Sequence, residues 1–455
     1  MESKEIGKYP VIKVEPPGPR ALAIIKEDKR LIMQSFARWY PLVVKKAYGS
    51  LVEDVDGNVY IDFNSGIAVM NVGHSHPRIV KAVARQVEKL IHYSLTDFYY
   101  EEAVEAARLL TSIAPISGAK VFFTNSGTES VEGAIKVARG FFKGARQYLI
   151  SFIGGFHGRT YGSMSASASK SIHRKHFGPL LPGFIHVPYP NPYRCPFKGV
   201  EGSECGDAVI EYIEDYLFMK LVDPEEVAGF IVEPILGEGG YVVPPDNFLP
   251  SLRRLASKYG FLLIVDEVQT GFGRTGKMFA VEHWAVEPDI MALAKAMGGG
   301  LPLGAIVGRR DVMSLPPGSH ANTFGGNPVA LSAFKEVVSL ILEERLYERA
   351  AKLGDEALKF LKEIQDSTEI VGDVRGKGLM IGVELVKDKA TKKPAVKELR
   401  EVLEKCFKRG LLVIGAGLST VRIAPPLTID RELFIRGLEI LGDVIKEVDR
   451  EAKGV

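Results

Sequence analysis

The sequence is poor in cysteine, asparagine and glutamine, and it lacks long apolar runs. Three cysteines among 455 residues do not indicate a disulfide framework. Eight asparagines and five glutamines favour a thermophilic source, although the ordinary charged fraction of 25% does not reinforce this. No uninterrupted apolar run reaches the roughly 18 residues needed to cross a bilayer, and residues 1–10 lack an apolar signal segment. We therefore expect a cytoplasmic protein with no membrane partner.

The charges nearly balance, which excludes further classes of partner. A formal net charge of +2 gives no support for binding to nucleic acid or to a membrane surface. A hydrophobic content of 46% is typical of soluble globular proteins. Because 455 residues exceed the usual size of one hydrophobic core, we expect two domains.

Short apolar runs alternate with stretches of helical periodicity, and this alternation predicts βαβ units and a mainly parallel sheet. The predicted strands are 59–63, 120–124, 147–152, 184–187, 229–232, 261–265, 290–294 and 305–307. The predicted helices between them include 79–90, 99–113 and 130–142. Farther on, the pattern predicts one long helix over 328–364, strands at 379–385 and 411–414, and helices at 396–409 and 430–453. Residues 163–171 and 189–206 are interpreted as loops.

These elements suggest an α/β fold with a large and a small domain. We expect residues 76–335 to form the large domain around the mainly parallel sheet, and residues 336–455 to form a smaller α+β domain. Residues 1–75 are expected to pack beside the small domain.

Two charged residues, Asp266 and Lys295, lie at the ends of short apolar runs typical of buried strands. Open α/β sheets carry their chemistry at such strand ends. Burial lowers the pKa of a lysine, so that its neutral amine can form a Schiff base, and a carboxylate can pair with a pyridine nitrogen. The pair therefore indicates a pyridoxal phosphate site. For these two residues alone, charges that merely face water at strand ends are the simpler interpretation.

A turn of small residues at 124–130 joins a predicted strand to a predicted helix. Backbone N–H groups at a helix N-terminus bind phosphate well, and Gly127 allows the backbone to come close. The hydroxyl groups of Ser126 and Thr128 can add hydrogen bonds. Taken alone, the turn is better explained as an ordinary helix cap. A similar turn at 322–328, which contains Thr323, also precedes a predicted helix.

The segment 271–277 matches G-x-G-x-x-G and nearly matches a P-loop, but both interpretations fail. Met278 occupies the position where a P-loop needs Ser or Thr to hold magnesium. A dinucleotide site needs its glycines directly after a strand and an acidic residue about 20 residues later, where Lys295 stands instead.

Together, the motifs resemble the signature of class III pyridoxal phosphate aminotransferases. The matching segments are GIAV at 66–69, GHSHP at 73–77, FHGRT at 156–160, VEPILGEGG at 232–240, DEVQTGFGRTG at 266–276, AKAMGGGLPLGA at 294–305, TFGGNP at 323–328 and VRIAPPL at 421–427. They span nearly the whole chain in one order. The resemblance implies the fold-type I transferase architecture and is closest to the 4-aminobutyrate and ornithine aminotransferases.

The resemblance also implies how the cofactor would be held. Lys295 would bind pyridoxal 5'-phosphate covalently and carry protons during the reaction, and Asp266 would pair with the pyridine nitrogen. The other implied cofactor-binding residues are Ser126, Gly127, Thr128, Phe156, His157, Val268, Gln269 and Thr323. Ser126, Gly127 and Thr128 would hold the phosphate, and Thr323 would come from the partner subunit of a homodimer or a higher even oligomer.

Two arginines would govern the choice of substrate. By resemblance, Arg159 would bind the carboxylate far from the reacting amine, and Arg422 would bind the α-carboxylate or be masked by Glu238. Glu233 and Ile67 are further expected substrate-binding residues. Ile67 resembles the 4-aminobutyrate type more than the ornithine type.

The implied reaction transfers an amino group from an ω-amino acid, such as 4-aminobutyrate or ornithine, to 2-oxoglutarate. The products would be a semialdehyde and glutamate. An amino acid racemase or epimerase using the same lysine is the alternative, because some family members reprotonate Cα from the opposite face. The Glu238–Arg422 pair favours the transferase, since a racemase has no need to accommodate two kinds of substrate. A non-catalytic binding protein is disfavoured because Lys295 and Asp266 are both present.

The remaining histidines and cysteines are given structural interpretations. His74 and His76 flank Ser75 in a turn, and we expect no metal site there. Cys195 and Cys205 are expected to be free thiols, with a disulfide between them as the alternative for a hyperthermophilic protein.

Overall fold

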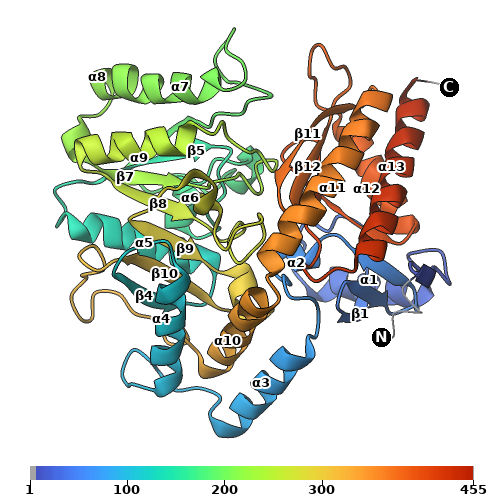
Figure 1. Cartoon of the computed structure of the whole chain (residues 1–455), viewed down its shortest axis with the longest axis horizontal. Coiled ribbons are helices and arrows are strands. Elements are labelled where there is room, and N and C mark those ends of the chain that lie inside the picture. The colour runs from blue at the N-terminus through green and yellow to red at the C-terminus, as the bar shows by residue number, and fades with distance from the viewer. Residues whose placement is uncertain (1–6, 454–455) are drawn as a thin grey trace.

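The computed structural model describes residues 7–453, in which a large sheet region lies beside a smaller region of helices and strands (Figure 1). Residues 1–6 of the segment 1–10, and residues 454–455 of the predicted domain 336–455, lie outside the described part. Within residues 7–453, no helix is both long enough and apolar enough to cross a membrane. The cytoplasmic location and the domain boundaries stay predictions.

A seven-stranded sheet forms the centre of the large region. Its strand order is β4 (Ala119–Thr124), β10 (Gly304–Arg309), β9 (Ile290–Leu293), β8 (Leu262–Asp266), β7 (Val227–Val232), β5 (Tyr148–Ile153), β6 (Phe184–Pro188). Strand β10 runs antiparallel to both of its neighbours, and every other adjacent pair is parallel. The predicted α/β fold with a mainly parallel sheet is therefore confirmed.

Helices cover both faces of this sheet. Those that contact its strands include α4 (Glu101–Ile113), α5 (Gly127–Phe141), α6 (Tyr161–Ala166) and α9 (Phe248–Tyr259). Farther out, α7 (Glu204–Glu211) packs on α9, α3 (Pro77–Lys89) packs on α10 (Pro328–Glu343), and α8 (Phe218–Lys220) follows α7 along the chain. Successive residues of β8 point to opposite faces: Ile264 packs in the hydrophobic cluster of α5, and Val265 packs in that of α9. Because both faces are buried, strands such as β7 and β8 are continuous apolar runs.

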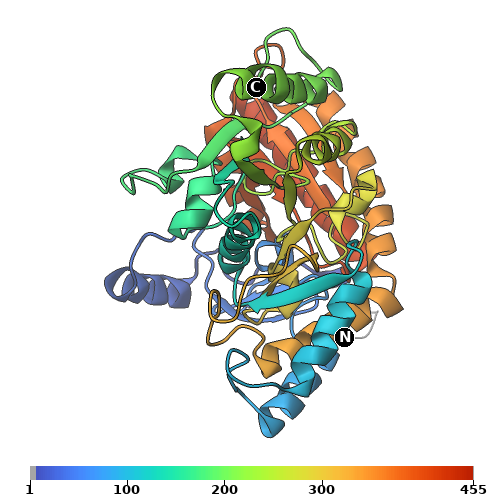
Figure 2. The ribbon, with the colours of Figure 1, turned by 90° about the vertical axis from the view of Figure 1, so that its left-hand side faces the viewer.

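The smaller region contains two further sheets. One has the antiparallel order β11 (Val371–Lys377), β12 (Met380–Leu385), β15 (Thr420–Ile423), β14 (Ile414–Ala416). The other joins β1 (Val44–Tyr48), β2 (Leu51–Asp54) and β3 (Val59–Asp62) to β13 (Leu411–Leu412). The pairing of β3 with β13 brings the N-terminal strands beside the C-terminal helices α12 (Val396–Lys408) and α13 (Arg431–Lys453). Helix α1 (Pro19–Leu31) stands out from the body (Figure 2).

Several sequence predictions need correction. The single helix expected over 328–364 is two helices, α10 (Pro328–Glu343) and α11 (Leu346–Ser367), because Arg345 adopts a left-handed conformation (φ +50°) that no helix can continue through. The strand expected at 411–414 is divided between β13 and β14. Part of the loop expected at 163–171 belongs to α6, whose small residues pack against α5. The sequence analysis also misses helices α1, α7, α8 and α9 and strands β1, β2, β11 and β15.

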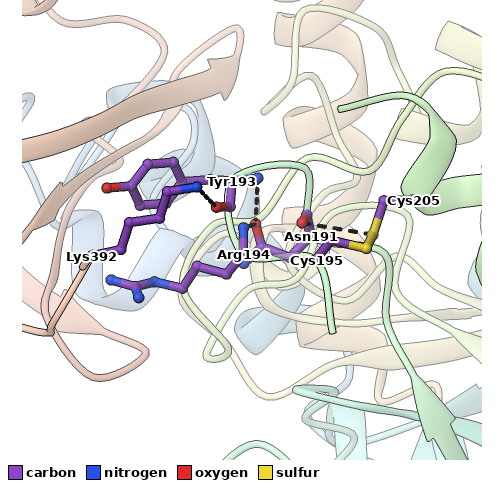
Figure 3. The surroundings of a disulfide bond; sticks show 6 residues. All are labelled: Asn191, Tyr193, Arg194, Cys195, Cys205 and Lys392. Atoms are coloured by element: carbon purple, nitrogen blue, oxygen red, sulfur yellow. Dashed lines mark hydrogen bonds between the residues drawn. A yellow bond between two sulfur atoms is a disulfide. The ribbon is translucent and has the colours of Figure 1, made fainter. Parts of the chain in front are cut away.

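The expectation of free cysteines at positions 195 and 205 is wrong, and the alternative holds. The two sulfur atoms lie 2.24 Å apart in a disulfide that closes part of the irregular segment before α7 (Figure 3). The two residues before Cys195 contact the small region, because Lys392 Nζ donates to the carbonyl of Tyr193 at 3.0 Å and Arg194 pairs with Glu384 on β12. The disulfide therefore ties α7 to a chain segment that contacts the small region.

We predict that Cys195→Ser lowers the thermal midpoint of the oxidised protein by a few degrees. A bridge over so short a loop stabilises the native state by up to about 3 kcal/mol in the chain-entropy model. Scanning calorimetry should give the same midpoint for the variant and for the reduced wild type, and reductant should leave the variant unchanged. Thiol titration of the unfolded, unreduced wild type should count Cys406 alone. Equal midpoints for the oxidised and reduced wild type would contradict this role.

Candidate active site

The predicted site residues meet at the carboxyl ends of the parallel strands. A cavity of about 450 Å3 is lined there by the turn before α5, the end of β8 and the end of β9. It shares Phe156, Arg159, Glu238, Gln269 and Lys295 with a larger outer cavity of about 1240 Å3. Residues 36–41 of the N-terminal segment form part of the outer wall.

Lys295 lies two residues beyond the end of β9, in a strained conformation. Its φ of +47° is rare for any residue other than glycine, and such strain is typical of functional sites. Burial, assisted by the positive charge of Arg422, lowers the pKa of Lys295 to about 8, although Asp266 acts in the opposite direction. A substantial fraction of the amine is therefore neutral near pH 8, as a nucleophilic amine requires.

Asp266 is held in place by two hydrogen bonds. Its Oδ1 accepts from the backbone N–H of Val268 at 3.0 Å, and its Oδ2 accepts from Nδ1 of His157 at 2.8 Å. Burial opposes the charged form of His157, but the hydrogen bond and charge of Asp266 outweigh it, so the pKa of His157 is raised. His157 lines the cavity, as expected of a cofactor-binding residue, and its hydrogen bond also supports Asp266.

The turn before α5 forms a cradle that only glycine allows. Ser126 caps the helix, because its Oγ accepts from the N–H of Glu129 at 3.3 Å. A Cβ at Gly127 would lie 2.8 Å from Cγ1 of Val268, which is too close. The side chain of Thr128 is oriented by contacts of its Oγ1 with Oγ of Ser163 at 2.6 Å and Oγ1 of Thr160 at 2.8 Å. These groups fit pyridoxal phosphate: the N-terminus of α5 suits its phosphate, the carboxylate of Asp266 suits its pyridine nitrogen, and the amine of Lys295 suits its aldehyde.

Glu233 ties two walls of the cavity together. Its Oε1 accepts from the N–H of Phe156 and its Oε2 from the N–H of Gly237, both at 2.7 Å. Burial raises the pKa of Glu233 to about 7. Because both oxygens are used by the backbone, we infer that Glu233 positions the segments carrying Phe156 and Glu238.

The outer part of the site carries the predicted arginines. Arg159 is exposed and lies over the ring of Phe156, with its guanidinium carbon 5.4 Å from the ring centre. Arg422, on β15, is 4% exposed and lies with Nη1 3.4 Å from Oε2 of Glu238. Ile67, which has a strained φ of +68°, lines the outer cavity. The structure therefore brings all of these residues to the two cavities.

Thr323 is the predicted site residue that the fold does not bring to its own cavities. It is exposed on the turn before α10 and lines neither the inner nor the outer cavity.

Two residues of the site escaped the sequence analysis. Lys170 donates from Nζ to Oε1 of Glu238 at 2.6 Å, and Tyr241 donates from its hydroxyl to Oε1 of Gln269 at 2.7 Å. Lys170 lies near the end of the run 163–171 interpreted as a loop, so the sequence offers no periodicity that would place it in the site.

Comparison with known proteins agrees with this geometry. A family model described as Aminotransferase class-III matches residues 33–445. The chain belongs to the class III aminotransferase family. Enzymes of this family depend on pyridoxal phosphate, and the predicted cofactor is confirmed by solved relatives described with PLP or PMP.

Relatives with different names are similar to the class III chain over nearly its whole length. Acetylornithine aminotransferase of Methanopyrus kandleri is 45% identical, over 91% of this chain and 96% of that protein. Leucine/methionine racemase of Thermococcus litoralis is 43% identical, over 95% of this chain and 97% of that protein. Alanine/serine racemase of Pyrococcus horikoshii is 40% identical, over 97% of this chain and 93% of that protein. Other matches are named 4-aminobutyrate aminotransferase and isoleucine 2-epimerase.

Solved structures share the fold as well. The ω-transaminase of Pseudomonas jessenii in complex with PMP superposes with a TM-score of 0.89 at 29% identity. The superposition covers 94% of this chain and 98% of that one.

We predict that Lys295 of the cofactor-free protein titrates near pH 8, far below an ordinary lysine. Competitive acylation across a pH series, read by mass spectrometry of the Lys295 peptide, measures this, with the other lysine peptides as internal references. Arg422→Ala should move the midpoint up and Asp266→Asn should move it down, because each removes the charge that acts on the amine. A midpoint near 10 in the wild type would contradict the assignment.

Proposed function

We propose that this enzyme transfers the amino group of an ω-amino acid, such as 4-aminobutyrate or ornithine, to 2-oxoglutarate. The observation that supports this proposal most directly is the Glu238–Arg422 contact in the cavity that Lys295 also lines. Such an enzyme must accept in turn an amine without a carboxylate next to it and glutamate, which has one. A carboxylate that can mask or release a buried guanidinium serves both substrates.

Each residue of the site would have a separate role in this reaction. Bound pyridoxal phosphate supplies an electron sink for the carbanion formed at the substrate carbon. Lys295 would hold the cofactor and, once released, carry the proton at the reacting carbon. Asp266, supported by His157, would keep the pyridine nitrogen protonated. Arg422 would orient the α-carboxylate.

Racemisation of an α-amino acid is the second candidate. Two relatives named as racemases are 40% and 43% identical over more than nine-tenths of the chain. The same lysine, carboxylate and cradle would serve that reaction, which differs only in where the proton returns. The presence of Glu238 beside Arg422 supports transamination over this alternative.

A half-reaction without oxo acid distinguishes the two functions. We expect 4-aminobutyrate or ornithine to convert the absorbance of the lysine-bound cofactor to that of its aminated form. Alanine, leucine and lysine complete the panel of single amines. Retention of the original absorbance with every amine, together with loss of optical rotation of an α-amino acid, would replace this function by racemisation.

We further propose that the enzyme is a homodimer, or a higher even oligomer, whose sites are completed across the subunit interface. Large apolar side chains are exposed beside the turn that carries Thr323: Ile91, Tyr93, Phe98, Tyr99 and Phe324. The ring centres of Phe324 and His92 lie 5.0 Å apart, and the hydroxyl of Thr96 donates to the carbonyl of Asn322. The two segments therefore form one surface. An apolar surface of this kind supports coverage by a second subunit, which would receive Thr323 at its phosphate cradle.

Mixed dimers test the role of Thr323. Thr323→Asp should abolish activity by placing a carboxylate beside the phosphate, and Lys295→Ala should abolish it by removing the amine. Co-expression of the two variants should restore about half of the activity per mixed dimer, because one of its two sites then contains both wild-type residues. If Thr323 served its own subunit, every site would carry one lesion and no activity would return. An active Thr323→Asp homodimer would also contradict the proposal.

A further inference from the structure

Glu238 is shared between two cations, and the contacts are unequal. Its Oε1 accepts a hydrogen bond from Nζ of Lys170 at 2.6 Å. Its Oε2 lies 3.4 Å from Nη1 of Arg422, which is an ion-pair distance without a hydrogen bond. Burial would raise the pKa of Glu238, but the charges of Arg422 and Lys170 outweigh it and lower that pKa, so the carboxylate is ionised. Lys170 therefore holds Glu238 more closely than Arg422 does.

Arg422 is left with donors that no residue in the described part of the chain satisfies. Its Nε and Nη1 are buried and make no hydrogen bond within residues 7–453. Buried N–H groups of a charged side chain are costly to leave unpaired, so the site favours an additional acceptor. Among Lys170, Glu238 and Arg422 there are two positive charges and one negative charge. A substrate carboxylate at Arg422 would supply the missing charge and accept the unpaired donors.

The backbone around Glu238 is fixed, which leaves the side chain as the moving part. The carbonyl of Glu238 accepts from the N–H of Gly417 at 2.8 Å. Arg375 donates to the carbonyls of Gly240 at 2.6 Å and Tyr241 at 3.0 Å. The segment carrying Lys170 is also tied down, because Ala168 exchanges backbone hydrogen bonds with Gly154 and Gly155. Masking of Arg422 therefore requires rotation of the Glu238 side chain away from Lys170.

We propose that Lys170 is a specificity-determining residue that competes with Arg422 for Glu238 and so keeps Arg422 available to the α-carboxylate of an amino acid. The free enzyme is thereby set for α-amino and α-oxo acids, and an amine without an α-carboxylate must break the Lys170–Glu238 pair. The inference rests on the proposed function only for the identity of the second substrate. The competition itself concerns carboxylate binding at Arg422.

Substitution of Lys170 tests the competition by a binding measurement on the holoenzyme. Lys170→Met removes the charge while keeping the length of the side chain, so Glu238 turns to Arg422 and masks it. We expect the dissociation constant of glutarate, an unreactive dicarboxylate measured by titration calorimetry, to rise about tenfold, which corresponds to the loss of one partly buried charge interaction. Lys170→Arg should retain tight binding, and the cofactor absorbance should be the same in all variants.

The background of Glu238→Gln separates competition from the simple loss of a positive charge. With no anion to mask Arg422, adding Lys170→Met should change glutarate binding by less than about twofold. If the tenfold loss persists in this background, Lys170 attracts the ligand directly and the inference is wrong. It is also wrong if Lys170→Met alone leaves glutarate binding unchanged. In Arg422→Ala, further substitution of Lys170 should have no effect on glutarate binding.

Steady-state kinetics add the consequence for substrates. Lys170→Met should lower kcat/KM for glutamate about tenfold and spare 4-aminobutyrate, so that the ratio of the two falls. Equal losses for both substrates would overturn the inference. An enzyme that converts neither amine in the half-reaction would contradict the proposed function. The glutarate experiment would still decide whether Lys170 competes for Glu238.

Discussion

The burial of the Lys295 amine is the constraint on which the rest of the site depends. A lysine at an exposed strand end would be protonated and unreactive at neutral pH. Here desolvation and the nearby charge of Arg422 lower its pKa to about 8, while Asp266 limits the shift by favouring the charged form. The position after β9, at the carboxyl edge of a sheet covered on both faces, supplies this burial. To turn the chain there, Lys295 adopts a left-handed backbone conformation, which is strained for a residue other than glycine.

Burial of one charged group requires that its neighbours be buried and paired as well. Asp266 and Glu233 both lie close enough to His157 to act on its charge, and each oxygen of the two carboxylates accepts a hydrogen bond. These bonds also set geometry. His157 connects the end of β8 to the segment carrying Phe156, and Glu233 connects that segment to the one carrying Glu238. The two walls of the inner cavity are therefore coupled through a few polar contacts that cannot be lost singly without leaving a buried group unpaired.

Much of this could be predicted from sequence because it depends on local patterns. Strand β8 and its terminal Asp266, strand β9 and Lys295, and the turn at Ser126–Gly127–Thr128 each combine an apolar run with a residue type that the chemistry requires. The contact of Lys170 with Glu238 joins residues 68 positions apart and depends on how two loops pack, which no periodicity encodes. The break at Arg345 is similar, because tertiary packing there overrides a helical pattern that continues through it. Thr323 lines neither cavity of its own subunit, so a single subunit does not test the prediction that it serves a partner's site.

Arg274 holds together the backbone segments that surround the substrate-binding side chains. It belongs to the G-x-G-x-x-G segment at 271–277, and it is completely buried. Its guanidinium donates to the carbonyls of Leu379 and Pro425 at 3.0 and 2.6 Å and to Oδ1 of Asn71 at 2.6 Å, although burial lowers its pKa to about 10. These bonds join the large region to the turn between β11 and β12, to the loop after β15 and to the N-terminal segment. Arg422 lies on β15, three residues before Pro425, so these bonds restrain the segment that carries it. If the enzyme accepts substrates with and without an α-carboxylate, as we propose, exchange of the Glu238 side chain between its two cations would distinguish them, because the backbone around it is held by these bonds.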